Sequence, residues 1–198
     1  MAGWSSCEAI PMRREIRLRT PLEESAVRGL EVGDIVHLDG RAFAIAYAFQ
    51  FQRAIDESKG GKPLPMDFKG SAILHFPTCF KEEDGKWRIV YFGPTTSSKF
   101  NKVTPEFVRR FGIRAIVGKG GMDEAVMEAM KEVGCVFLQA IGGCAVIYTK
   151  GVKGITNVYW GERHWTYAVV ELELGNFGPL IVTMDAKGRR LGKEERGP

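Results

Sequence analysis

The sequence predicts an α/β fold in which a mixed sheet carries helices on one side. Strand-like and amphipathic helical segments follow one another without the strict strand–helix–strand alternation of a doubly wound fold. The chain has 198 residues, 44% of them hydrophobic and 26% charged, which is typical of a globular protein with one sizeable core. Residues 13–191 are therefore expected to form one domain, between a flexible leader (1–12) and a charged tail (192–198).

Strands are expected where apolar residues alternate with polar ones or run together for a few positions. Nine segments have one of these patterns: Arg13–Arg19, Asp34–Leu38, Ala72–Phe76, Trp87–Phe92, Ile113–Val117, Cys135–Leu138, Ala145–Tyr148, Tyr167–Leu174 and Leu180–Met184. Turn residues separate several of them. Asp39-Gly40 predicts a turn directly after the second segment, and Asp84-Gly85 predicts one in a charged loop before the fourth.

Helices are expected where capping residues precede an apolar stripe. Thr20-Pro21 and Thr104-Pro105 each place a hydroxyl cap before a proline and an acid, which predicts a helix start. The segment 41–58 is ambiguous at its start, and we favour a helix over Tyr47–Ser58. Another helix is expected over Met122–Val133, whose apolar residues share one face.

Charge, hydropathy and cysteine spacing exclude several classes of function. The formal net charge is 28 − 24 = +4, too mild to indicate nucleic-acid binding. No apolar run approaches the ~20 residues of a membrane span, and the first eleven residues lack a secretory signal. None of the four cysteines forms a C-x-x-C pair, so no metal site made by this chain is expected. A cytoplasmic, reducing location follows as the expectation.

The loop Gly118-Lys119-Gly120-Gly121 is the first candidate for chemistry. It lies between a predicted buried strand and a predicted helix, where unpaired N–H groups and the helix dipole attract anions. Lys119 adds a full positive charge, so the loop suits a carboxylate or a phosphate. A tight turn with a solvated lysine explains the same residues.

A second candidate is the turn Gly93-Pro94-Thr95-Thr96-Ser97-Ser98-Lys99. Four hydroxyls follow a strand end, with a lysine just behind them. Hydroxyls placed this way can bind carboxylates or pass a proton. They are also common in turns for purely structural reasons.

Weaker signals come from Gly142-Gly143 and from the histidines. The glycine pair allows a close backbone approach, but a bulge or tight turn accounts for it. His37, His75 and His164 are far apart and form no H-x-x-x-H pair. His164 lies in a polar and aromatic cluster, where a hydrogen-bonded structural histidine is favoured.

Taken in order along the chain, these motifs are similar to a known family. Gly93-Pro94-Thr95-Thr96-Ser97 followed by Gly118-Lys119-Gly120 is the specific part of the pattern. Supporting blocks occur before, between and after these two: Thr20-Pro21-Leu22, Gly33-Asp34, Pro63-Leu64-Pro65, Gly142-Gly143 and Gly161-Glu162. Over about Arg17–Leu191, the chain resembles the β subunit, or C-terminal domain, of class I fumarases and L(+)-tartrate dehydratases, as a divergent member.

The resemblance implies a fold, an activity and a partner. The family fold is a swivelling β/β/α domain, and its enzymes reversibly hydrate fumarate to malate or dehydrate tartrate. A [4Fe-4S] cluster acts as Lewis acid on the small dicarboxylate substrate. The α subunit holds that cluster, and this chain holds none. An αβ or α2β2 hetero-oligomer with a shared active site is therefore implied, without nucleic acid or membrane.

The resemblance also implies roles for individual residues. Thr96 matches the threonine implicated in proton transfer, and Lys119 matches a lysine that binds a substrate carboxylate. Lys99 falls where the family has arginine. Three neighbours complete the implied substrate-binding set: Thr95, Gly118 and Gly120.

This sequence departs from the family pattern in three places, one of which is Phe76, where the family has a glycine before Pro77-Thr78. Lysine at 99 keeps the charge but loses the bidentate fork of an arginine. The family's Arg-Asp-x-x-His block corresponds here to the stretch from Ala46 through Tyr47 to Gln50, and all three family residues are absent. An alternative is therefore a non-catalytic or regulatory anion-binding paralogue.

Overall fold

The computed structural model describes residues 14–143, 146–162, 164 and 167–191; the expected leader and tail lie outside them. The strands are β1 (Glu15–Arg19), β2 (Ile35–Ala44), β3 (Ala72–Leu74), β4 (Thr78–Glu83), β5 (Lys86–Phe92), β6 (Ala115–Gly118), β7 (Val136–Gln139), β8 (Val152–Tyr159) and β9 (Val169–Met184). The helices are α1 (Glu24–Arg28), α2 (Ala48–Lys59), α3 (Thr104–Phe111), α4 (Glu124–Val133) and α5 (Val146–Thr149), and Ser97–Phe100 form a 3-10 turn. This order confirms the predicted mixture of strands and helices.

The main sheet closes on itself. Its strand order is β1-β2-β3-β6-β7-β9-β8, and β2 also pairs with β9. Strands β2, β3, β6, β7 and β9 therefore form a five-stranded, barrel-like ring. The pairs β2–β3, β3–β6 and β6–β7 are parallel, whereas β9 runs antiparallel to β7 and β2. The sheet is mixed, as predicted.

Both faces of the ring are apolar at its short parallel strands, which explains why β3, β6 and β7 are almost continuously apolar. Ala72 and Leu74 of β3 join one buried cluster, while Ile73 between them joins the other. The alternation repeats in β6, where Ile116 faces away from its two neighbours. The second cluster also holds the buried residues of α2, α3 and α4.

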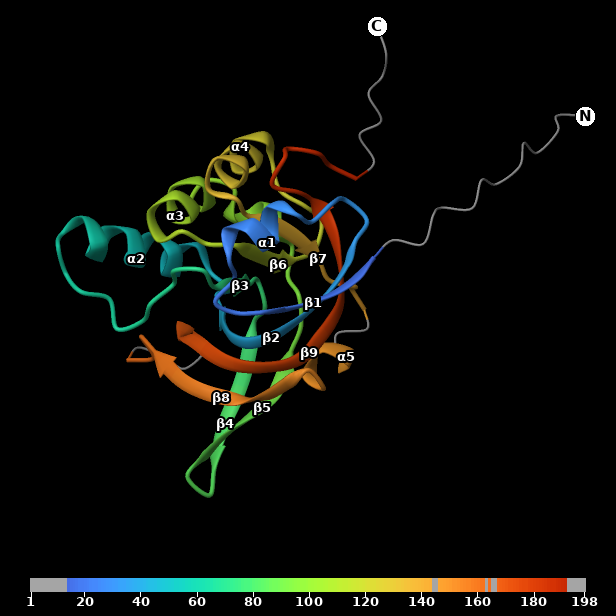
Figure 1. Ribbon diagram of the computed structural model, residues 1–198. Helices are drawn as coiled ribbons and strands as arrows, with labels where there is room; N and C mark the ends of the chain where they lie inside the picture. Colours follow the sequence, from blue (N-terminus) through green and yellow to red (C-terminus); the bar gives the residue numbers. More distant parts are fainter. Residues whose placement is uncertain (1–13, 144–145, 163, 165–166, 192–198) are drawn as a thin grey trace, which may run out of the picture.

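The three longest helices lie together on one side of the sheet, as Figure 1 shows at the top of the view. The expectation of helices on one side therefore describes α2, α3 and α4. The short α1 and α5 differ, because Val27 and Tyr148 join the opposite cluster. No helix in the described ranges is long and apolar enough to cross a membrane.

The predicted turn at Asp39-Gly40 is wrong, because β2 runs straight through it. The register between β2 and β9 shifts on both sides of Leu38, so these residues form an irregularity within the strand. Gly40 has φ of +86°, and a Cβ there would lie 2.8 Å from the Thr20 carbonyl oxygen. Thr20 caps no helix, since its N–H donates to the Asp39 carbonyl at 2.9 Å and α1 begins only at Glu24.

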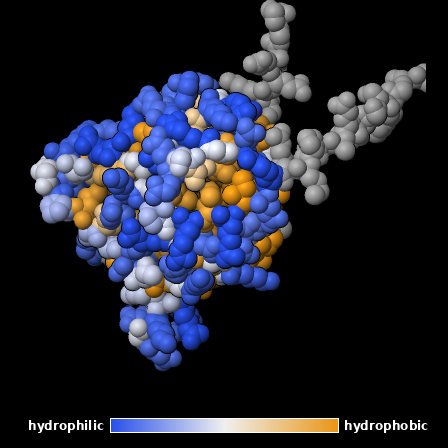
Figure 2. Space-filling view, in the orientation of Figure 1, coloured by the Kyte–Doolittle hydropathy of each residue, from blue (hydrophilic) through white to orange (hydrophobic). Residues whose placement is uncertain are grey.

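The charged loop predicted before β5 is mostly strand. It forms β4, which pairs antiparallel with β5 around the predicted turn. Asp84 and Gly85 both have positive φ, at 53° and 71°, which confirms that turn. The hairpin projects from the body at the bottom of Figure 1, and its tip is hydrophilic in Figure 2. The consecutive charged residues Lys81, Glu82 and Glu83 concealed a strand whose outer half faces water.

The last third of the chain differs most from the prediction. Val146–Thr149 is a helix, and Ala145 lies outside the described residues. The two strands expected at 167–174 and 180–184 form one strand, β9, paired along most of its length with the unpredicted β8 and with β2. Gly175 and Gly178 lie inside β9, where a Cβ would overlap Lys153 and the His37 side chain. These glycines allow close packing and do not mark a turn.

Asp39 ties three strands together at the irregular point of β2. Its carboxylate accepts hydrogen bonds from the Arg17 guanidinium of β1 and, at 2.9 Å, from the Asn176 N–H of β9. The Arg17 hydrogen bond, followed by that of Asn176, holds the pKa of Asp39 well below its usual value. The carboxylate therefore stabilises the fold above the ordinary aspartate pKa, and this stabilisation is lost as the pH falls toward the lowered value.

Asp39→Asn is expected to lower the free energy of unfolding by about 2 kcal/mol at pH 7, because hydrogen bonds to a charged group are lost. The deficit should shrink below about pH 4, because the unfolded wild-type chain then takes up a proton at Asp39 that the folded chain does not bind. Urea unfolding at pH 7 and pH 3 measures both. The exposed Asp84→Asn serves as control and should change little. Equal stability of wild type and Asp39→Asn at pH 7 would contradict the assignment.

Candidate functional site

Three segments meet at the carboxyl edge of the parallel strands β3 and β6. His75 follows β3, and its carbonyl accepts a hydrogen bond from the Thr95 N–H at 2.8 Å. Thr96 forms an isolated parallel bridge with Lys119, just after β6. The Ser97 N–H donates to the Lys119 carbonyl at 3.0 Å. The hydroxyl turn and the lysine loop, 20 or more residues apart in sequence, therefore lie side by side.

A buried polar pair lies under this junction. His75 Nδ1 and Ser97 Oγ are 2.9 Å apart, and both side chains are fully buried. The imidazole packs against Phe51 and Phe100, and its burial lowers the pKa of His75 to about 3. His75 is therefore neutral at physiological pH. This pairing could not be predicted from local sequence patterns, since the two residues are 22 positions apart.

Gly118 is required by this pair. A Cβ at Gly118 would overlap Ser97 Oγ and would lie 3.3 Å from the Cβ of His75. Its carbonyl accepts a hydrogen bond from the Ala140 N–H at 2.7 Å. Gly118 therefore leaves space for the Ser97 side chain because it has no side chain of its own. The sequence-based prediction gave Gly118 a role in ligand binding and did not include this packing role.

The N–H of Gly120 already has a partner. It donates to Oε1 of Gln139 at 3.1 Å, and the side-chain amide of Gln139 donates to the Ala140 carbonyl. The start of α4 is capped by Asp123, whose carboxylate accepts from the Val126 N–H at 3.1 Å. A carboxylate of the protein thus already occupies the helix start that the glycine loop suggested for a ligand.

The two lysines supply positive charge without a carboxylate of their own. Lys99 is exposed, and its Nζ lies 3.4 Å from Thr95 Oγ1. Lys119 is half-buried, with Cδ close to the backbone of Gly142. Among the described residues, neither ammonium is within ion-pair distance of an acid. Lys99 thus lies beside the Thr95 hydroxyl, and Lys119 is bridged through its backbone to Thr96. A cation next to a half-buried hydroxyl suits an anion.

The stretch from Ala46 to Gln50 serves the fold. The Gln50 side chain is buried, accepts from the N–H groups of Ala46 and Tyr47 at 2.9 Å, and donates to the carbonyls of Tyr167 and Ala168. It therefore caps α2 and joins that helix to the start of β9. Glutamine at this position has a structural explanation that requires no ligand.

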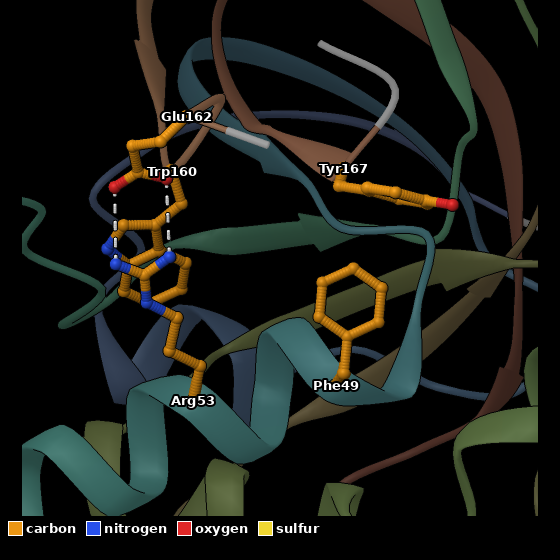
Figure 3. Close-up of a pocket in the computed structure, with 5 residues that line it drawn as sticks. All are labelled: Phe49, Arg53, Trp160, Glu162 and Tyr167. Atoms are coloured by element: carbon orange, nitrogen blue, oxygen red, sulfur yellow. Dashed lines mark hydrogen bonds and ion pairs between the residues drawn. The ribbon is translucent and has the colours of Figure 1, made fainter. Parts of the chain in front are cut away.

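A cavity of about 570 Å³ opens beside the same helix, as Figure 3 shows. Five side chains line it: Phe49, Arg53, Trp160, Glu162 and Tyr167. The Arg53 guanidinium stacks over the indole of Trp160, 4.6 Å from its centroid, and forms ion pairs with Glu57 at 2.9 Å and Glu162 at 3.3 Å. Its charge is already balanced by these two acids, so it does not replace the missing arginine of the 46–50 stretch.

The described residues contain no group of three or more His, Cys, Asp or Glu side chains that could hold a metal ion. Cys135 is fully buried, and burial raises the pKa of its thiol far above the usual value. Cys79 is half-buried, and the other two cysteines lie outside the described ranges. An iron–sulfur cluster therefore finds no ligand set in the described part of this chain.

Comparison with known proteins places the chain in a family. The family model described as "Fumarase C-terminus" matches residues 4–194, almost the whole sequence. This chain belongs to the fumarase C-terminus family. The resemblance read from the two glycine motifs is thereby confirmed.

Three relatives show which kinds of protein this chain is similar to. A "Putative L(+)-tartrate dehydratase subunit beta" of Methanocaldococcus jannaschii is 40% identical, over 87% of this chain and 89% of that protein. The "L(+)-tartrate dehydratase subunit beta" of Escherichia coli is 31% identical, over 90% and 87%. A "Putative fumarate hydratase class I" of Geobacillus stearothermophilus is 34% identical over 92% of this chain but only 34% of its own length. The chain is thus similar to whole β subunits and to one third of a longer fumarase.

Gly118→Ala is expected to destabilise the fold by about 1–3 kcal/mol, because the added methyl overpacks the buried pair. Adding Ser97→Ala to the same chain removes the overlapping oxygen and should restore part of the loss. Thermal and urea unfolding measure both effects. Gly154→Ala, in β8 with open space around its Cβ position, is the matched control and should change little. No rescue by Ser97→Ala would contradict the packing role of Gly118.

Proposed function

We propose that this chain is the β subunit of a two-subunit, iron–sulfur-dependent hydro-lyase that acts on a small dicarboxylate. The reaction is the reversible hydration of fumarate to malate, or the dehydration of tartrate. Family membership and the names of the relatives support the reaction class. The observation that carries the proposal is the bridge between Thr96 and Lys119, which puts a hydroxyl and an unpaired cation on one surface.

Each residue of this surface has a proposed role that follows from its side-chain chemistry. Lys119 binds one substrate carboxylate through its ammonium, and Lys99, close to Thr95 Oγ1, adds charge for the second. The hydroxyl of Thr96 relays a proton: in hydration it gives its own proton to the substrate carbon and takes one from the attacking water, and in dehydration both transfers run in reverse. Gly118 and Gly120 set the course of the loop that carries Lys119. Thr95 contributes a further hydroxyl.

The partner supplies what this chain lacks. A [4Fe-4S] cluster held by an α subunit would act as the Lewis acid on the substrate. Residues 13–191 then form one swivelling domain that closes the active site against that subunit, in an αβ or α2β2 assembly. The described residues supply hydroxyls and cations beside one another, which supports a role in substrate binding.

A second candidate is a non-catalytic, anion-binding paralogue. The observation in its favour is the structural use of the 46–50 stretch, where Gln50 caps α2 and the nearby Arg53 is balanced by two acids. Such a chain would bind carboxylates through Lys99 and Lys119 but would turn nothing over.

The test is to co-express the chain with a cluster-bearing α-type subunit, reconstitute the cluster without oxygen, and assay fumarate, malate and tartrate. Thr96→Ala should lower kcat by roughly 10²–10⁴-fold, the usual contribution of a positioned proton donor. Lys119→Ala should mainly raise KM, by roughly tenfold or more, because a charge-assisted contact is lost. Ser98→Ala, an exposed neighbouring hydroxyl, is the matched control.

The outcomes separate the two candidates. Turnover that depends on Thr96 supports the hydro-lyase. A loaded complex that turns over none of the three substrates, yet binds them in a Lys119-dependent way, supports the paralogue. Turnover unaffected by Thr96→Ala would remove this threonine from the proposed mechanism.

A further inference from the structure

A second cavity, of about 350 Å³, lies where the last described residues return to the sheet. Its walls come from the loop after β6, the end of β7, the end of β9 and the final described turn. The lining residues used below are Gly120, Gln139, Thr183 and Arg190. The final turn is held in place because the Leu191 N–H donates to the Thr183 carbonyl at 2.9 Å and Arg190 bridges to Met184.

Arg190 differs from its basic neighbours, because none of the described residues forms an ion pair with its guanidinium. Lys187 and Arg189 form ion pairs with Glu31, and Arg189 also pairs with the buried Asp185. By contrast, Nε and Nη2 of Arg190 are buried and make no hydrogen bond with any described residue. A buried guanidinium edge without an acceptor is costly, so its position is better explained by an anion that it receives.

The hydroxyl of Thr183 also lacks a hydrogen-bond partner among the described residues. Thr183 is another residue that lines the cavity, and its Oγ1 is buried. Gln139 does not compete for a ligand, because its carbonyl oxygen accepts from the Gly120 N–H and its amide donates to the Ala140 carbonyl. Two residues that line the cavity thus carry, among the described residues, unsatisfied polar atoms: two guanidinium nitrogens of Arg190 and the hydroxyl of Thr183.

The arrangement of these groups selects the class of ligand. Nε and Nη2 lie on one edge of the guanidinium plane and present two parallel N–H donors. The two oxygens of a carboxylate match that fork, and a hydroxyl can donate a third hydrogen bond to the same anion. No acidic side chain lines the cavity. A cation or a neutral apolar ligand would leave the guanidinium edge unsatisfied.

We propose that this cavity is a carboxylate-binding site in which Arg190 forms the bidentate contact and Thr183 a third hydrogen bond. The site belongs to this chain alone and does not rest on the proposed hydro-lyase activity. Because Gly120 lines it, a bound carboxylate would contact the loop that carries Lys119. Occupancy would thereby act on the position of that loop.

The experiment is a titration of the isolated, ¹⁵N-labelled full chain with sodium succinate, with sodium chloride at matched ionic strength as reference. Saturable shifts are expected at the amides of Gly120 and Thr183 and at the Arg190 Nε–H. Arg190→Gln should weaken binding at these signals at least about tenfold, as expected for a bidentate charged contact. Thr183→Val, of similar shape, should weaken it several-fold.

Two further variants keep the test decisive. Lys187→Gln removes the same charge three residues away and should bind as the wild type does. Arg190→Lys keeps the charge but loses the fork, so its affinity should fall between those of wild type and Arg190→Gln. A dispersed amide spectrum for each variant shows that it has folded.

The proposal is overturned if succinate gives no saturable shift at these signals, or if Arg190→Gln binds as tightly as Lys187→Gln. A parallel titration with sodium phosphate tests the class of ligand. Phosphate that binds the same signals more tightly than succinate would overturn the carboxylate assignment. Succinate shifts at Lys119 that are lost in Lys119→Ala but kept in Arg190→Gln report on the proposed substrate surface instead.

Discussion

The buried contact between His75 and Ser97 is the constraint on which the proposed site depends. Ser97 is the residue after Thr96, and its side chain is anchored to the end of β3 by a neutral imidazole in an apolar surrounding. Its backbone N–H is anchored to the carbonyl of Lys119 after β6. One serine therefore fixes the turn that carries Thr96 against both neighbouring strands, and Gly118 leaves the space that it needs.

The closed ring explains why this anchoring is rigid. Strands β3 and β6 are short, but each is paired on both sides, and the antiparallel β9 joins β7 to β2 to complete the circle. With α2, α3 and α4 packed on its outer face, the ring gives the loops at its edge little freedom to separate. The proposed site is thus built from loops, while its geometry comes from the strands beneath them.

The parts of the fold with strong local signals could be predicted from sequence. The buried strands β3, β6 and β7, the helices α3 and α4, and the turn at Asp84-Gly85 have apolar patterns or capping residues that leave few alternatives. The errors fall where tertiary packing overrides local preference. The sequence predicts a turn at Gly40, but this residue lies within β2, where a Cβ would meet the backbone and side chain of Thr20.

The candidate site was also predictable only in part. Thr96 and Lys119 could be proposed because their motifs follow a family order, and the parallel neighbours β3 and β6 bring them together. His75 and Arg190 could not, because nothing local marks an imidazole that supports a turn 22 residues away, or a guanidinium edge left without an acceptor. Such features depend on the packing of distant segments.

The central claim is that the chain holds the Thr96 turn and the Lys119 loop together before any partner binds. Amide hydrogen exchange on the isolated chain tests this through the N–H groups of Thr95 and Ser97, which cross between the three segments, and of Ala140, which donates to the Gly118 carbonyl. The account predicts that these amides exchange slowly, close to the rates of the β6 strand and far below that of Gly85 in the exposed hairpin turn. Exchange as fast as that of Gly85 would show that the site is not preformed and would contradict the account.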